Sequence, residues 1–88
     1  MKLRGEFVIR QVIDEVIAIP VGDMALEFNG MIMLNDVSRV IFECLSDDTS
    51  AEQILSAVTE KFELTTDEAG ADITEFIDKL REINIIED

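Results

Sequence analysis

The segment FNGMIMLND, which runs from Phe28 to Asp36, places four apolar side chains in a row directly after an Asn-Gly pair. A strand with one face on the core and the other in water should alternate apolar and polar residues. Here Met31 and Met33 point to one side of the strand, and Ile32 and Leu34 point to the other. Either the chain itself buries both faces, with both methionines in the core, or one face borders an open groove.

The apolar period changes from two to 3.6 after this segment, which predicts a helix. Asn35 is a favourable N-cap. The polar run at 46–48 ends the helix, and its predicted apolar face consists of Val37, Val40, Ile41, Cys44 and Leu45.

Two more helices are predicted downstream, each beginning at a capping-box signal. The second helix has two overlapping signals, Thr49 with Glu52 and Ser50 with Gln53, and the third has Thr65 with Glu68. Their predicted inward residues are Ile54, Leu55, Val58 and Phe62, and then Ala69, Ile73, Phe76, Ile77, Leu80 and Ile83. Roughly three residues join these two helices, which is the spacing of a helix-turn-helix.

Upstream of the opening segment, a stretch rich in Val and Ile predicts two strands, Glu6–Val12 and Val16–Val21, folded near Asp14–Glu15. Pro20 cannot donate a ladder hydrogen bond, so it should end the second strand or lie on an edge. Residues 24–28 read equally as a short strand or a loop. In either case Asn29–Gly30 should supply a positive φ. The tail at 84–88 should add a few extended residues.

This order predicts an α+β fold in one domain, residues 1–88. A small antiparallel sheet of about three N-terminal strands precedes three helices in a winged helix-turn-helix-like arrangement.

The charge balance limits the partners. Twenty acidic residues face seven basic ones, for a net charge of −13, which disfavours both nucleic acid and anionic membranes. A basic or apolar peptide or protein is the natural partner. No apolar run reaches the ~18–20 residues of a membrane span, and the N-terminal segment has no signal-peptide core, so we expect a cytoplasmic protein.

Catalytic chemistry is poorly represented. The chain has no His, and its single cysteine, Cys44, falls on an apolar helix face and is predicted to be a core residue. No phosphate-binding glycine loop or calcium loop occurs. The carboxylates at Asp72, Glu75, Asp78 and Glu82 form either a solvated face or a contact for a basic partner. We therefore expect no enzyme, cofactor or metal.

Five sequence features follow one another along the chain: IPVGD, FNG, Leu34–Asn35 before the first helix, DDTSAEQI and FIDKLREINII. With these features the whole chain, in order and length, resembles the PqqD family, whose members are also described as recognition elements for ribosomally synthesised and post-translationally modified peptides (RiPP recognition elements). Two positions depart from the family pattern. Phe42 stands where tryptophan is frequent, and Ser38 stands where a Gly or Ala is frequent.

The resemblance implies a non-catalytic module of natural-product biosynthesis. Such a module captures the leader segment of a precursor peptide and presents it to a modifying enzyme. The enzyme would be a radical S-adenosylmethionine maturase, as in pyrroloquinoline quinone (PQQ) biosynthesis, or the leader peptidase of a lasso-peptide pathway. The leader would add as a strand beside the third strand and against the third helix. The predicted peptide-binding residues are Asn29, Gly30, Met31, Ile32, Met33, Leu34, Asp72, Glu75, Phe76 and Lys79.

Within this site, Ile32 and Leu34 should face the core, while Met31 and Met33 border the groove. In the third helix, Phe76 and Leu80 fall on one line, extended by Asp72 and Ile83, and Ile73 and Ile77 fall on the adjacent line. One of these two rows of side chains should pack on the core, and the other should face the groove.

Three other readings compete with this one. A DNA-binding winged helix needs a basic recognition helix, whereas here the third helix is acidic. An acyl carrier protein needs a serine in an Asp-Ser-Leu setting and an all-helical chain. A subunit or regulator of another complex that uses the same groove stays open, as does a weak homodimer in place of a monomer, because an exposed edge strand can pair with its own copy.

Overall fold

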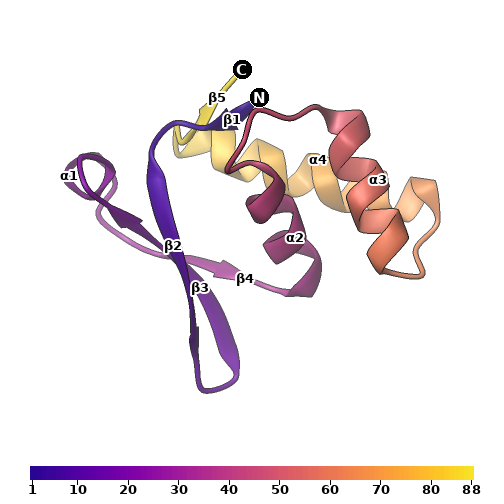
Figure 1. The fold of residues 1–88 in the computed structure, drawn as a ribbon, viewed down its shortest axis with the longest axis horizontal. Helices are drawn as coiled ribbons and strands as arrows, with labels where there is room; N and C mark the ends of the chain where they lie inside the picture. Colours follow the sequence, from indigo (N-terminus) through magenta and orange to yellow (C-terminus); the bar gives the residue numbers. More distant parts are fainter.

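The computed structural model describes residues 1–88, with strands first and helices afterwards as predicted. The elements, shown in Figure 1, are β1 (Lys2–Leu3), β2 (Glu6–Val12), β3 (Glu15–Val21), α1 (Met24–Glu27), β4 (Ile32–Leu34), α2 (Asp36–Cys44), α3 (Ala51–Lys61), α4 (Thr66–Glu82) and β5 (Ile86–Glu87). The predicted α+β fold class is confirmed, because a three-stranded antiparallel sheet, β2-β3-β4, precedes the three main helices α2, α3 and α4.

The β2–β3 hairpin confirms both predicted strands but turns one residue earlier than expected. Val12 pairs with Glu15, so the turn residues are Ile13 and Asp14. Ile13 has a left-handed φ of 56°, which suits the first central residue of a tight hairpin turn. A β-branched residue rarely adopts this conformation, so its side chain gave no turn signal.

Pro20 lies within β3, opposite Phe7. It is the second-last residue of the strand, beyond the Val16–Ala18 segment that pairs with β4. The side of β3 away from β2 has no strand partner at Pro20, so the missing N–H breaks no ladder there.

The connection from β3 to β4 differs from both expectations. It contains the one-turn helix α1, where we expected a strand or a loop. Its first residue, Met24, is buried in the core, and the space for it depends on Gly5, where a Cβ would approach the Met24 Cβ to 2.7 Å. The positive φ in this connection lies at Gly22 (61°) and at neither Asn29 nor Gly30.

The three predicted helix starts are confirmed. Capping boxes join Asn35 with Ser38, Ser50 with Gln53, and Thr65 with Glu68. The overlapping capping box predicted for Thr49 with Glu52 was wrong. The Thr49 hydroxyl instead donates to Gln53 Oε1 at 3.1 Å, and Glu52 takes no part. Four residues, 62–65, separate α3 from α4, close to the predicted helix-turn-helix spacing.

The buried face of α2 is rotated from the predicted one. Ser38, Ile41 and Phe42 are buried, while Val37, Val40 and Cys44 are only half-buried. The reason is tertiary, because the Phe42 ring meets the Phe7 ring of β2 edge-on, with centroids 5.3 Å apart. This contact draws the helix toward the sheet on a side that its own periodicity did not indicate.

The core lies between the inner face of the sheet and the three main helices. Its fully buried side chains come from every layer, with Ala18 from β3, Ile41 from α2, Val58 from α3 and Leu80 from α4. The outer face of the sheet is also apolar, but residues such as Val8 and Ile19 do not belong to this cluster.

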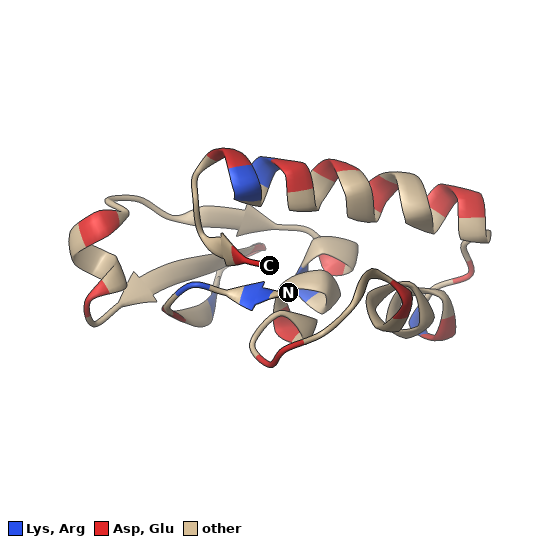
Figure 2. Ribbon diagram, turned by 90° about the horizontal axis from the view of Figure 1, so that it is seen from above, with Lys and Arg blue, Asp and Glu red and all other residues tan.

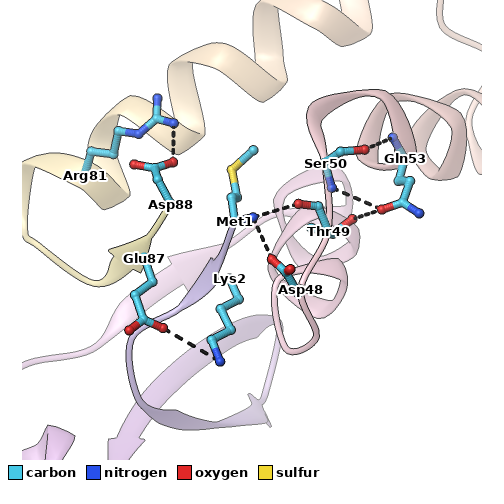
Figure 3. Close-up of polar contacts among 9 residues, drawn as sticks. All are labelled: Met1, Lys2, Asp48, Thr49, Ser50, Gln53, Arg81, Glu87 and Asp88. Carbon is cyan, nitrogen blue, oxygen red and sulfur yellow. Dashed lines mark hydrogen bonds and ion pairs between the residues drawn. The ribbon is translucent and has the colours of Figure 1, made fainter.

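The two chain ends are joined by a second, two-stranded ribbon. β1 pairs antiparallel with β5, which confirms the expected extended tail. Figure 3 shows the polar contacts around this ribbon: Lys2 with Glu87 at 3.8 Å and Arg81 with Asp88 at 2.9 Å. The Met1 ammonium donates to Asp48 at 2.8 Å, which lowers the pKa of that carboxyl.

Candidate functional site

β4 is an edge strand. It pairs with β3 through Val16↔Leu34, Ile17↔Met33 and Ala18↔Ile32, and no strand pairs with its other side. A free strand edge presents unpaired N–H and C=O groups that can template another chain. In both Figure 1 and Figure 2, α4 runs alongside this strand in the opposite direction.

A groove of about 560 Å³ lies between β4 and α4. This volume is in the range of ordinary ligand sites. The residues that line it come from the approach to β4, from β4 itself, from the start and first turns of α2, and from α4 between Asp72 and its C-cap Ile83. They are Phe28, Met31, Ile32, Met33, Asn35, Val37, Ser38, Ile41, Asp72, Glu75, Phe76, Lys79, Leu80, Glu82 and Ile83.

The predicted binding residues fall mostly on this groove. It is lined by Met31, Ile32, Met33, Asp72, Glu75, Phe76 and Lys79. The other three do not line it. Asn29 and Gly30 are exposed in the segment before β4, and Leu34 is buried in the core at 6% exposure.

The two faces of β4 are divided as predicted. Leu34 is buried and Ile32 packs against the core, while Met31 and Met33 are 60% and 61% exposed. The alternative, in which the chain buries both methionines, is wrong. A strand with apolar side chains on both faces therefore has one face that nothing in this chain covers.

α4 divides its apolar residues between core and groove. Ile73, Ile77 and Leu80 are buried, whereas Phe76 is half-buried and Ile83 is 41% exposed. Leu80 was predicted on the same line as Phe76. It is only 1% exposed, so it belongs to the core, although it also contributes to the groove lining. The stripe that faces the groove is Asp72, Phe76, Lys79 and Ile83, at helical spacing.

The two walls of the groove differ in charge. All of its charged residues come from α4, and the β4 and α2 side contributes none. Lys79 pairs with Glu75 at 3.5 Å, while Asp72 and Glu82 have no ion-pair partner. Figure 2 shows the acidic residues recurring along α4.

The polar groups at the end of β4 are already engaged. The Ser38 N–H donates to Asn35 Oδ1 at 2.8 Å, and the Asn35 N–H donates to Ser38 Oγ at 2.8 Å. The Asn35 Oδ1 and the Ser38 hydroxyl are therefore occupied by the start of α2. The charged recognition available in the groove comes from α4, beside the free edge of β4.

The sequence prediction missed part of the groove lining, including Phe28, Val37, Ile41, Glu82 and Ile83. Ile83 lay on the predicted Phe76 line, and Glu82 belonged to the predicted acidic stripe. The sequence pattern could therefore have placed both in the groove, although neither was predicted to bind the peptide. Phe28 carried no such signal, and Val37 and Ile41 were predicted only as part of the apolar face of their helix.

Cys44 lies outside this groove and is half-buried. Burial, with a smaller contribution from Glu43, raises the pKa of its thiol. A raised pKa is opposite to that of an activated nucleophile. No group of three or more His, Cys, Asp or Glu side chains is placed to hold a metal ion, and none of the helices has both the length and the apolar character needed to cross a bilayer.

The fold and groove define a class of protein: a small α+β domain, winged helix-turn-helix-like, with an open edge strand facing an acidic helix. The chain belongs to the PqqD family, since the family model described as "Coenzyme PQQ synthesis protein D (PqqD)" matches residues 14–86. The predicted family resemblance is thereby confirmed.

A solved structure shares the fold. TbiB1, determined in complex with the TbiA(beta) leader peptide, matches with a TM-score of 0.75 and 21% sequence identity, over 99% of this chain and 95% of TbiB1. No protein of curated function matches the chain.

Proposed function

We propose that this chain is a non-catalytic peptide-binding module that captures the leader segment of a ribosomal precursor peptide. The observation that carries the proposal is the open edge of β4 beside an apolar groove. A leader in extended conformation would add to β4 as a fourth strand. Main-chain hydrogen bonds would then supply affinity, and pockets for alternate side chains would supply specificity.

The exposed methionines support this role. Met31 and Met33 present flexible, polarizable side chains to the groove, and such side chains repack around different partners. An open apolar strand edge is also an aggregation hazard in a protein that never covers it. Membership of the PqqD family agrees with a peptide partner, and so does the shared fold of TbiB1, which was solved with a leader peptide.

The bound leader would be presented to a modifying enzyme, either a radical S-adenosylmethionine maturase or a leader peptidase, in the cytoplasm. The module itself would supply no catalytic group, cofactor or metal. The alternative occupant of the groove is a segment of another complex, for which this chain would be an acidic interaction subunit. A second copy of the chain is opposed by its net charge of −13.

The test is a binding measurement with two segments of one precursor. A fluorescein-labelled leader peptide, from the precursor encoded beside this protein, is titrated with the protein and followed by fluorescence anisotropy. The core segment of the same precursor and a scrambled leader serve as controls. We expect saturable binding of the leader at micromolar protein and none of the controls. Equal binding of all three peptides, or none at millimolar protein, would refute leader capture.

A further inference from the structure

The charges of the groove are unequally paired. Its one cation, Lys79, is already bound to Glu75 at 3.5 Å. Asp72 and Glu82, which line the same groove, have no cation within ion-pair distance. The groove therefore offers two uncompensated carboxylates to whatever lies in it. Because the Asn35 Oδ1 and the Ser38 hydroxyl are engaged with each other's backbone, these carboxylates are the groove's side chains best able to select a peptide by charge.

The spacing of the two carboxylates fits an extended peptide. Asp72 and Glu82 are ten residues apart in α4, which corresponds to about 15 Å along the helix axis. Side chains on one face of an extended strand recur every second residue, so positions i and i+4 lie about 14 Å apart. Since β4 and α4 run side by side (Figures 1 and 2), a strand added to β4 would follow the helix axis.

The segment between the carboxylates is apolar where the peptide would pass. Phe76 lies four residues after Asp72 on the same stripe, about 6 Å along the axis, and Ile32, on the face of β4 that packs toward the core, also lines the groove. The peptide residue at i+2, about 7 Å from residue i, would face this apolar contact. A charged residue there would lose hydration without gaining a partner.

From this geometry we infer the chemical class of the ligand: an extended peptide with Lys or Arg at positions i and i+4 and an apolar residue at i+2. The basic residues pair with Asp72 and Glu82, and the apolar side chain packs between Phe76 and Ile32. This inference rests on the proposed function, since it specifies the sequence that the same groove selects.

The test is a selection from a displayed library of random nine-residue peptides, with the purified protein as bait. Two variants are selected in parallel. D72N/E82Q removes the two unpaired carboxylates. D47N/E63Q makes the same change of charge at two exposed residues outside the groove. All four substitutions are at exposed positions, and circular dichroism checks that both variants are folded.

We expect the wild type and D47N/E63Q to enrich peptides with basic residues four apart around an apolar one, and D72N/E82Q to lose the basic preference. In an enriched peptide, replacing either basic residue by Gln should weaken binding by about 2- to 5-fold. Enriched peptides without this pattern, or a pattern that D72N/E82Q leaves unchanged, would overturn the inference while leaving peptide capture intact. A selection that enriches no peptide would refute the proposed function as well.

Discussion

Replacing Met33 by Ala should separate peptide binding from folding. The substitution removes three heavy atoms, worth roughly 2.4 kcal/mol if all were fully buried at ~0.8 kcal/mol each. Met33 is 61% exposed, so only about 1 kcal/mol of this contributes to folding in the free protein. The remaining ~1.4 kcal/mol becomes available when a leader covers the side chain, which corresponds to a tenfold change in Kd.

Two control variants make the comparison sharp. Met24→Ala is the same chemical change at a core position that is 3% exposed, and it should lower the free energy of unfolding by about 2–5 kcal/mol. Leu26→Ala removes an apolar side chain that is 86% exposed but lies outside the groove, and it should change stability by no more than about 0.5 kcal/mol. Neither change should alter the Kd of the folded protein for a leader.

Stability is measured by urea denaturation followed by far-ultraviolet circular dichroism, because the chain has no Trp or Tyr. Affinity is measured by isothermal titration calorimetry with the leader peptide. A Met33→Ala variant that binds as tightly as the wild type would show that the leader does not cover Met33. The same conclusion follows if Leu26→Ala weakens binding more than Met33→Ala does.

Three further predictions concern single residues outside the groove. Ile13→Asn should raise the melting temperature by about 4–8 °C. Ile13 is 87% exposed at φ 56°, and this left-handed conformation costs a β-branched residue about 1 kcal/mol. A lower melting temperature would contradict the turn at Ile13–Asp14. Gly70→Ala should raise the free energy of unfolding by about 0.5–1 kcal/mol in a urea titration. Gly70 is helical, and an added Cβ would meet nothing within 4 Å. An unchanged free energy of unfolding would count against a regular helix at this position. Cys44 should react with iodoacetamide more slowly in the folded than in the urea-unfolded protein at pH 8, because the pKa of its thiol is raised in the folded state. The difference between the two reaction rates should narrow as the pH rises. Equal rates at pH 8 would be inconsistent with burial of the thiol.

The elements that could be predicted are those whose signals are local. The helix starts at Ser50 and Thr65 were predicted because a capping box is complete within four residues, and the start at Asn35 because asparagine is a favourable N-cap. The strands β2 and β3 follow from Val- and Ile-rich composition. The two faces of β4 follow from a period of two, which fixes Met31 and Met33 opposite Ile32 and Leu34.

The features that could not be predicted depend on residues distant in the sequence. α1 forms where Met24 reaches the core beside Gly5, and the buried face of α2 is set by the ring contact of Phe42 with Phe7. The turn at Ile13 was missed for a different reason, since a residue with strong strand preference occupies a strained turn position.

The candidate site was predictable where periodicity alone places a residue on a face. Asp72, Phe76 and Lys79 recur on one stripe of α4, and they line the groove. Phe28 and Val37 line it because of where the tertiary fold places the chain before and after β4, which no local pattern indicates. Asn29 and Gly30 were among the predicted peptide-binding residues, yet the structure places them outside the groove.

The central claim is that a leader peptide adds to the open edge of β4 against α4. An amide chemical-shift titration of the 15N-labelled protein with the synthetic leader tests it most directly. We predict shifts concentrated at Met31–Leu34 and Asp72–Lys79 that saturate at micromolar peptide. Shifts confined to other surfaces, or no shifts at millimolar leader, would contradict leader capture at this groove.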